Sequence, residues 1–473
     1  MLYEPVIGLE VHVHLKTKTK AFCGCSTEYG SLPNTQTCPV CLGLPGALPV
    51  LNELALEYAV KVALALNCKI QEVIKFDRKH YYYPDLPKNY QISQYDMPLA
   101  LNGYLEVGQP ARRIGIKRVH FEEDAGKLIH QEDGFSSLVD YNRSGMPLLE
   151  IVTEPDINSP EEAYEYLRNL KLIIQYLGVS DCDMEKGSLR CDANISLRPK
   201  GQQELGVKIE LKNMNSFRWV RQALDYEIQR QSKILLSGKK IIQETRLWDE
   251  NKLVTISMRT KEEASDYRYF PDPDLTPFIF EKAYLDKLRS QLPQLPKEKE
   301  KKFQQEYGLS EKQAQLLIEN KQLCDLFEEG IKLKAQPQKI YNWLSQVVLS
   351  ADNVKEAIDF LISKPQELIK IIDYVDEGKL SNIAAKEVFR IAIDQKEEVD
   401  EVIQRKGIIQ LSDQQQLERL VVQVIEENKK SVQDYLSGKE NALMFLIGQA
   451  MRISKGKANP KLLKEIFIRR LKA

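Results

Sequence analysis

The sequence predicts a domain that mixes β-strands with helices, of the α+β or α/β class, followed by an all-helical region. Up to about Phe280 the sequence shows strand-like alternation, Gly and Pro turns and a few helical stretches. After the Pro- and Lys-rich segment 291–302, a candidate linker, strand signals vanish and helical runs follow one another. A length of 473 residues allows about three domains, and a second break near Lys406 sets off a short C-terminal region.

Charge and hydropathy exclude several classes of protein. Lys plus Arg number 67 against 68 for Asp plus Glu, so an anionic partner must meet a local basic patch. The N-terminus lacks the basic and apolar stretches of a secretory signal, and no apolar run approaches the roughly 18 residues of a membrane span. We therefore expect a cytoplasmic protein that does not enter membranes.

The first predicted strand is "GLEVHVHL", residues 8–15. Its apolar residues alternate with polar ones, as in a half-buried strand: Leu9, Val11, Val13 and Leu15 against Glu10, His12 and His14. A carboxylate and two imidazoles on one face supply ligands for a metal ion. The alternative is a face that is merely solvated.

Later stretches predict further strands that carry acids. Polar and apolar residues alternate in 187–199 and 207–213, and the apolar run "PLLEIV" is interrupted by Glu150. The stretch "RVHFEEDAG" adds Glu122 and Glu123 near a turn, without a clear phase. Oxygen ligands with at most one His suit Mg²⁺. These faces therefore predict either a Mg²⁺ site for phosphoryl chemistry or unrelated surface ion pairs.

The best-marked helix lies between Ser159 and Gly178. Ser159 is the expected N-cap, Pro160 takes the first helical position, and Gly178 marks the end. Glu162 is expected to close a capping box with Ser159.

Four of the eight cysteines form two closely spaced pairs: Cys23 with Cys25, and Cys38 with Cys41. In a reducing compartment this spacing predicts a closed tetrahedral zinc site, which is structural because four thiolates leave no exchangeable position. Four free thiols are the alternative. Cys182 and Cys191 flank apolar residues and are expected in the core.

Two segments combine cations with features of nucleic-acid binding. Residues 76–96 place aromatic rings beside cations, which suits stacking on a single-stranded end, although packing of some tyrosines in a core is equally expected. The closing residues 451–473 carry many Lys and Arg, which predict either a phosphate-binding patch or a solvated helical face. The sequence contains neither GxxxxGK[ST] nor GxSxG, so a P-loop ATPase and a common hydrolase nucleophile are not indicated.

Several stretches carry a family resemblance: "VIGLEVHVHL", "FDRKHYYYPDLPKNYQISQYD", "EEDAGK", "LLEIVTEPD", "GSLRCDANISLRP", "ELKNMNSF", "DYRYFPDPDL" and "GKANP". In this order they resemble the signature stretches of the B subunits of bacterial aspartyl/glutamyl-tRNA amidotransferases, over nearly the whole chain. The resemblance implies an α+β fold with three parts: a cradle-like catalytic domain on an antiparallel or mixed sheet at 1–293, a helical domain at 294–405, and a tRNA-binding helical tail domain at 406–473.

The resemblance also implies a ligase activity. In the family, the B subunit uses ATP and Mg²⁺ to activate the side-chain carboxylate of misacylated Glu-tRNA(Gln) or Asp-tRNA(Asn), and ammonia then displaces phosphate to give the amide. The ammonia comes from glutamine hydrolysed on the amidase, which is the A subunit, and a small C subunit completes a heterotrimer. The absence of a hydrolase nucleophile motif fits this division of labour.

Roles for single residues follow from the same resemblance. The residues that resemble ligands of one Mg²⁺ are His12, Glu123 and Glu150. Those that resemble the surroundings of a second, nucleotide-linked metal are Glu10, Asp192 and Glu210. Lys79 and Lys88 resemble residues near the ammonia exit. The residues expected to bind tRNA are Lys455, Lys457 and Lys461. On charge alone we add three nucleotide contacts: Arg190, Lys208 and Lys212.

Other expectations concern what the reaction does not need. Many family members lack the cysteines, so the zinc site is expected to stand outside the reaction. His14 matches no metal position of the family and is expected to be dispensable. Two rival hypotheses are a non-catalytic tRNA-binding scaffold, whose acids are surface groups, and an independent zinc hydrolase, which the four-thiolate spacing disfavours.

Overall fold

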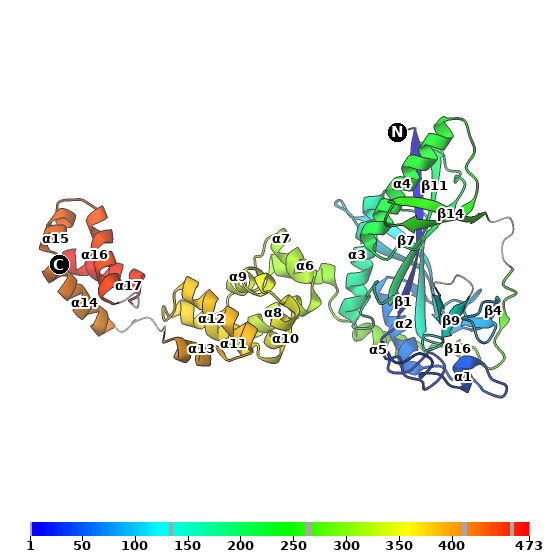
Figure 1. The fold of residues 1–473 in the computed structure, drawn as a ribbon, viewed down its shortest axis with the longest axis horizontal. Coiled ribbons are helices and arrows are strands. Elements are labelled where there is room, and N and C mark those ends of the chain that lie inside the picture. Colours follow the sequence, from blue (N-terminus) through cyan, green and yellow to red (C-terminus); the bar gives the residue numbers. More distant parts are fainter. Residues whose placement is uncertain (1, 132–135, 261–265, 408–413, 455–457, 473) are drawn as a thin grey trace. The chain divides into compact units, whose positions relative to one another are not determined.

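The computed structural model describes residues 2–131, 136–260, 266–407, 414–454 and 458–472. The chain divides into two compact units, Met1–Pro296 and Lys297–Ala473 (Figure 1). The first contains every described strand and the second is built of helices, so the predicted α+β class is confirmed. The division falls close to the boundary predicted at residue 293.

A nine-stranded sheet is the frame of the first unit. Its strands are β1 (Tyr3–His14), β2 (Lys69–Ile70), β6 (Ala100–Val107), β7 (Arg112–Glu123), β10 (Pro147–Thr153), β11 (Leu189–Pro199), β12 (Ile209–Lys212), β13 (Glu244–Asp249) and β14 (Val254–Thr260). Across the sheet the order is β14-β13-β12-β11-β1-β10-β7-β6-β2, with the N-terminal strand at the centre. Neighbours run antiparallel except for the parallel pair β12 and β13, so the sheet is mixed.

In the described ranges three smaller sheets accompany the large one, and two of them join segments that are distant in the sequence. One contains β4 (Asp77–His80), β5 (Tyr90–Ser93) and β15 (Phe270–Pro271). The other two are the pairs β3 (Val73–Ile74) with β16 (Phe278–Ile279) and β8 (Lys127–His130) with β9 (Ser137–Asp140).

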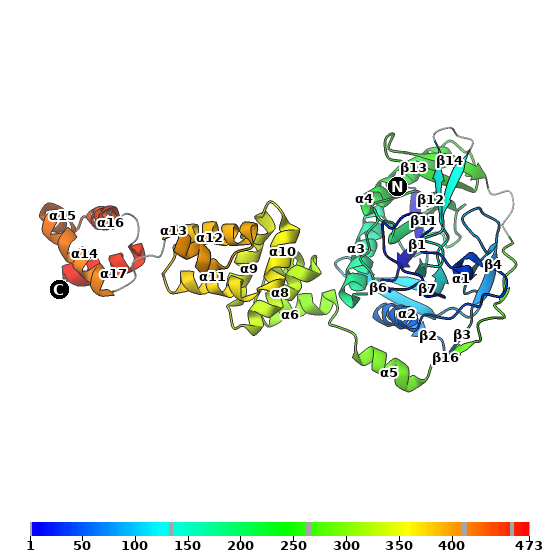
Figure 2. The same ribbon diagram turned by 60° about the horizontal axis from the view of Figure 1, so that its bottom comes forward.

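Helices cover one face of the large sheet. The helices of this unit are α1 (Pro39–Leu42), α2 (Glu53–Ala65), α3 (Pro160–Leu177), α4 (Phe217–Leu236) and α5 (Lys282–Ser290). Helix α3 packs against β6 and α4, and α4 packs against β11 and β14 (Figure 2). Leu9, Val11 and Val13 of β1 are buried in the core, together with Cys182 and Cys191, as predicted. The opposite face of β1 is left for polar side chains.

The ends of α3 follow the predicted signals with one difference. The Ser159 hydroxyl accepts a hydrogen bond from the N–H of Glu162 at 3.1 Å, and Gly178 ends the helix with φ +71°. The Glu162 carboxylate, however, accepts from the N–H of Asn158 at 2.8 Å instead of from Ser159. Glu162 also pairs with Arg112 Nη1 at 2.7 Å, a partner from a distant strand that local pattern could not reveal.

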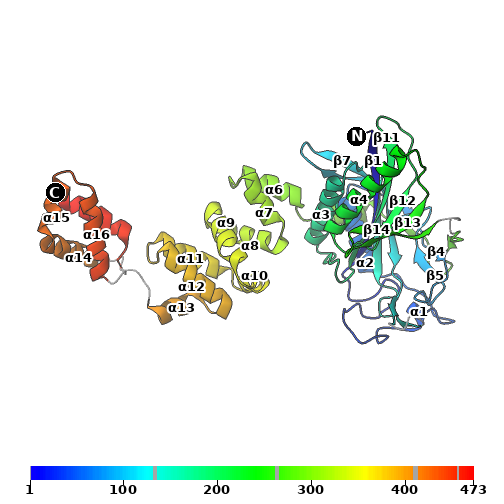
Figure 3. The ribbon, with the colours of Figure 1, turned by 45° about the horizontal axis from the view of Figure 1, so that its top comes forward.

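The second unit is helical throughout its described residues. Its helices are α6 (Pro296–Gln305), α7 (Glu311–Ile318), α8 (Lys321–Lys332), α9 (Pro337–Gln346), the short 3₁₀ helix η1 (Val348–Ser350), α10 (Val354–Ser363), α11 (Gln366–Asp376), α12 (Asn382–Gln395), α13 (Val399–Lys406), α14 (Gln414–Glu427), α15 (Lys429–Leu436), α16 (Asn441–Ile453) and α17 (Pro460–Lys472). The last four of these helices, orange to red in Figure 3, enclose an apolar core of their own that includes Leu417, Leu446 and Phe467. The further division of this unit at residue 405 stays a prediction. None of the helices in the described ranges combines the length and apolar character needed to cross a lipid bilayer.

The cap of α3 gives a stability prediction. Ser159→Ala removes the acceptor for the N–H of Glu162, and we expect a loss of about 1 kcal/mol in the free energy of unfolding of the first unit. Ser159→Thr keeps the hydroxyl and should retain most of that stability. Urea unfolding of both variants measures the difference; equal losses would show that the hydroxyl is not the cap.

Candidate active site and metal centre

A row of polar residues crosses the exposed face of the large sheet. His12 on β1 lies opposite Glu150 on β10 and opposite Arg190 on β11, and Glu150 lies opposite His120 on β7. Residues directly opposite one another point to the same side of a sheet. The row therefore brings two imidazoles, a carboxylate and a guanidinium together from four strands.

Three carboxylates surround the ring of His12. Its Nε2 lies 3.8 Å from Glu10 Oε1, 3.9 Å from Glu122 Oε1 and 3.9 Å from Glu150 Oε2. We call these four residues the His12 cluster. Such separations are too long for hydrogen bonds, yet two ligands about 2.1 Å from a shared Mg²⁺ stand up to about 4.2 Å apart. Ligand atoms of Glu10, His12 and Glu150 all lie within 4.8 Å of one another, so this donor set fits Mg²⁺.

The carboxylates of the His12 cluster repel one another. Burial and the charges of Glu150 and Asp192 raise the pKa of Glu10 to about 7. Burial and the charge of Glu150 raise the pKa of Glu122 to about 8. Burial lowers the pKa of His12, which favours the neutral imidazole that a metal requires. A bound cation is what this arrangement of acids would stabilise.

Glu123 lies apart from the His12 cluster in the described contacts, and its role as a Mg²⁺ ligand stays a prediction. Its carboxylate forms an ion pair with Lys88 and accepts from the N–H of Ile92 at 2.9 Å, whereas the neighbouring Glu122 turns toward His12. The reason is strand phase: the side chains of Val119 and Phe121 are both buried, and Glu122 falls on the other face of β7. That apolar alternation was the signal that could have selected Glu122.

Asp124 forms ion pairs with three residues in a second ionic group. Its Oδ2 lies 2.6 Å from His14 Nε2, 2.8 Å from Arg190 Nη2 and 3.5 Å from Arg143 Nε. Burial acts to raise the pKa of Asp124, but the two guanidinium groups and His14 hold it well below its usual range. His14 thus has a buried ionic partner that its position on the strand did not indicate, and Asp124 fixes Arg190 beside His12.

The side of the face near β12 carries a third ionic group. Lys212 Nζ lies 2.5 Å from Asp192 Oδ2 and 3.4 Å from Glu210 Oε1, and Asp192 lies opposite Glu10. The structure therefore brings Lys212 together with all three residues expected around a second metal. Lys208 instead is exposed just before β12.

Buried polar atoms without partners also point to a ligand on this face. Arg118 Nε, His120 Nε2 and Asn194 Oδ1 are buried and accept or donate no hydrogen bond within the described part of the chain. Arg118 Nη2 lies 3.7 Å from Glu150, at the edge of the His12 cluster. An unmatched buried polar atom is costly, so these atoms are suited to contact a polar ligand.

Aromatic side chains gather around the three-stranded sheet. Lys79 Nζ lies 5.0 Å from the ring of Tyr267, and the rings of Tyr95 and Tyr269 stack at 4.5 Å. Burial acts to lower the pKa of Lys79, but the charge of Glu122 and of other nearby groups raises it. Residues 76–96 and the aromatic residues of 266–275 thus form one structural feature.

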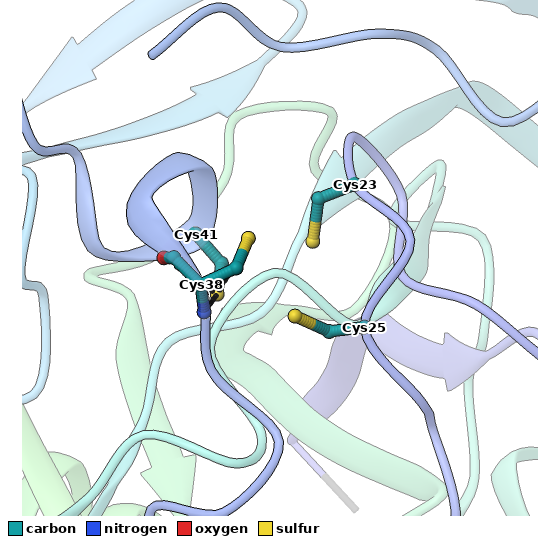
Figure 4. Close-up of side chains that lie close together, drawn as sticks. All are labelled: Cys23, Cys25, Cys38 and Cys41. Carbon is teal, nitrogen blue, oxygen red and sulfur yellow. Dashed lines mark hydrogen bonds between the residues drawn. The ribbon is translucent and has the colours of Figure 1, made fainter.

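The four N-terminal cysteines converge (Figure 4). Their Sγ atoms all lie within 4.8 Å of one another, and Cys38 Sγ is 3.9 Å from Cys41 Sγ. A tetrahedral site with Zn–S bonds of about 2.3 Å separates its sulfurs by about 3.8 Å. A hydrogen bond with Cys23, the N–H of Cys38 and the charge of Lys20 lower the pKa of Cys41 to about 4. The donor set and spacing fit a zinc ion.

The segment that carries the four cysteines, residues 23–43, is called the cysteine loop, and it touches the Lys88–Glu123 pair. A Cβ added to Gly43, which ends α1 at φ +69°, would lie 2.4 Å from Lys88 Cγ. A Cβ added to Gly145 would lie 3.4 Å from Cys41 Cβ and 3.7 Å from Glu123 Oε2. The cysteine loop and the Lys88–Glu123 pair are therefore in close packing contact.

Of the expected tRNA contacts, Lys461 is exposed on α17. Lys455 and Lys457 lie outside the described residues.

Comparison with known proteins gives matches over almost the entire chain. Residues 5–286 match the family described as the GatB/GatE catalytic domain, and residues 325–471 match the family described as the GatB domain. The B subunit of the aspartyl/glutamyl-tRNA(Asn/Gln) amidotransferase of Carboxydothermus hydrogenoformans is 54% identical over 98% of each chain. The proteins of the same name from Thermoanaerobacter sp. and Brevibacillus brevis are 52% identical over 99% of each chain and 49% identical over 98% and 99%.

The cysteine geometry predicts a metal content. The purified chain should carry about one zinc ion, and Cys25→Ser should abolish it, because three thiolates hold zinc far less well. Cys324→Ala, which changes a buried cysteine of the second unit, is the control and should keep the ion. Elemental analysis with thiol titration tests this; a disulfide between any two of the four residues would contradict it.

Proposed function

This chain belongs to the family of aspartyl/glutamyl-tRNA(Asn/Gln) amidotransferase B subunits, and from that premise we propose that it activates the side-chain carboxylate of misacylated Glu-tRNA(Gln) and Asp-tRNA(Asn) with ATP. Ammonia then displaces phosphate to give Gln-tRNA(Gln) and Asn-tRNA(Asn). The observation that carries the proposal is the His12 cluster, in which one imidazole faces three carboxylates at 3.8–3.9 Å.

The chemistry requires what this face supplies. A carboxylate is a poor electrophile, and phosphorylation turns one of its oxygens into part of a leaving group. Mg²⁺ held by Glu10, His12 and Glu150 would neutralise the charge of phosphoryl oxygens. Glu122 turns a further carboxylate oxygen toward the same space.

Cations flank the acids on both sides. Arg190, fixed by Asp124, and Lys212, paired with Asp192, lie on the β11 and β12 side and suit nucleotide phosphates. Arg118 lies on the β7 side, with an Nε that has no hydrogen-bond partner in the described ranges. We assign Arg190 and Lys212 to the nucleotide and Arg118 to the anionic acceptor. Glu210, which accepts from Thr245 at 2.8 Å, would help to hold a second metal with Asp192.

Ammonia would enter past the Lys88–Glu123 pair and Lys79. These groups lie beside the cluster, and Lys79 is enclosed by tyrosines. Exclusion of water protects an acyl phosphate from hydrolysis. The ammonia source is a glutaminase partner, the A subunit of the complex, and a small C subunit completes the heterotrimer.

The C-terminal helices would bind the body of the tRNA. Lys461, together with Lys455 and Lys457, supplies phosphate contacts that position the substrate without reading its sequence. In this division, residues 294–405 connect the cradle to a tail domain at 406–473.

Substitutions in the cluster distinguish this enzyme from a tRNA-binding scaffold. In the reconstituted complex, Glu122→Gln and Glu150→Gln should lower misacylated-tRNA-stimulated ATP hydrolysis by about 100-fold or more, because each removes a metal-facing carboxylate. Affinity for tRNA should stay near the wild-type value. Glu123→Gln should retain more hydrolysis than Glu122→Gln, since Glu123 pairs with Lys88.

The control for these variants is His130→Ala, an exposed imidazole on β8. It should leave both hydrolysis and glutamine-dependent amidation unchanged. Unimpaired hydrolysis in Glu150→Gln would favour the scaffold.

A matched pair of glycine substitutions tests the packing of the cysteine loop on Lys88. Gly43→Ala forces a Cβ against the Lys88 stem, whereas Gly46→Ala, at φ +85°, adds a Cβ with nothing within 4 Å. Both carry the strain of a positive φ. We expect amidation to fall about 10-fold further in Gly43→Ala, because a displaced Lys88 disturbs the site. Equal amidation rates would mean that the position of Lys88 is unimportant.

A further inference from the structure

Lys20 is a lysine with no solvent exposure, next to the cysteine site. Its Nζ donates to the carbonyl of Gln36 at 2.7 Å and lies 3.4 Å from the carbonyl of Tyr141 and 3.7 Å from Cys41 Sγ. Lysine is rarely buried without a charged partner, because removing an ammonium from water is costly. The two carbonyls supply dipoles but no charge, so they leave the ammonium without a counter-charge.

The cysteine site can supply that charge as thiolate, and Cys41 Sγ is the sulfur that lies 3.7 Å from the ammonium. Four thiolates and one Zn²⁺ carry a net charge of −2, and four neutral thiols carry none. A single ammonium at 3.7 Å from one of the sulfurs would reduce the net charge of the centre to −1. The burial of Lys20 is thus matched by thiolate charge, which a metal–thiolate centre would hold in place beside the ammonium.

Lys20 also joins the two halves of the site. Its backbone N–H donates to the carbonyl of Cys25 at 3.0 Å, in the first cysteine pair. Its side chain reaches the second pair, where Gln36 precedes Cys38 and the ammonium approaches Cys41. One residue thereby fixes both pairs in the arrangement that a single ion would hold.

We propose that Lys20 is the buried counter-ion of the zinc–thiolate centre and a positioning residue that sets its affinity for zinc. The proposal rests on the zinc site inferred above and goes beyond it, because it assigns a function to a residue that is not a ligand. Charged or hydrogen-bonded partners behind the ligands tune a metal site by about 10- to 100-fold in affinity.

The test compares Lys20→Met with Lys18→Met in the full-length chain. Met removes the charge and keeps the length of the side chain, and Lys18, two residues earlier and exposed, is the matched control. Zinc dissociation constants are measured by competition with a chromophoric chelator. We expect the zinc dissociation constant to rise 10- to 100-fold in Lys20→Met and to change less than about 2-fold in Lys18→Met.

Cobalt substitution separates a charge effect from a loss of structure. At saturating Co²⁺, Lys20→Met should keep the visible d–d absorption intensity of a tetrahedral thiolate site. The sulfur-to-metal charge-transfer band should move to lower energy, because a nearby positive charge is gone. If Lys20→Met does not fold, Lys20→Gln, which can still donate to the Gln36 carbonyl, should show the same weaker affinity and the same shift.

Each outcome bears on one hypothesis. Wild-type affinity and an unshifted band in the Lys20 variants would overturn the counter-ion and leave the zinc site standing. Weaker affinity without a band shift would reduce Lys20 to a packing role and also overturn the proposal. Failure of the wild-type chain to bind zinc or Co²⁺ would overturn the zinc site itself.

Discussion

The antiparallel pairing of β1 with β10 on one side and β11 on the other is the constraint on which the site depends. It places the apolar residues of three strands under α3 and α4 and turns their polar residues to the opposite face. A shift of one residue in either register would move His12 and Glu150 into the core, where their charge could not be compensated. The apolar core and the polar site are therefore specified by the same hydrogen-bond ladder.

Charge balance is the second constraint. The His12 cluster holds three carboxylates near one imidazole, and burial and repulsion by Glu150 raise the pKa values of Glu10 and Glu122. Two cations of the face already have carboxylate partners outside the cluster: Arg190 pairs with Asp124 and Lys212 pairs with Asp192. A diffusible metal ion is the group that such an arrangement can accept, and a nucleotide would bring one with it.

The cysteine loop and the sheet are in contact through small residues. Gly43 lets the loop lie against Lys88, and Gly145 lies between Cys41 and Glu123. This packing gives a physical route by which a centre that takes no part in the chemistry could still affect the geometry of the reacting groups. The expectation that the cysteine site stands outside the reaction stays a prediction.

The sequence by itself determined what depends on local pattern: the alternation of β1, the cap and end of α3, the burial of Cys191, and the spacing of two cysteine pairs. Each is fixed by the period of an element or by residues a few positions apart. Only the tertiary structure paired Glu123 with Lys88, gave His14 its partner Asp124, and enclosed Lys20. Those outcomes rest on contacts between segments distant in the chain, and the energy that selects them comes from partners that no local window contains.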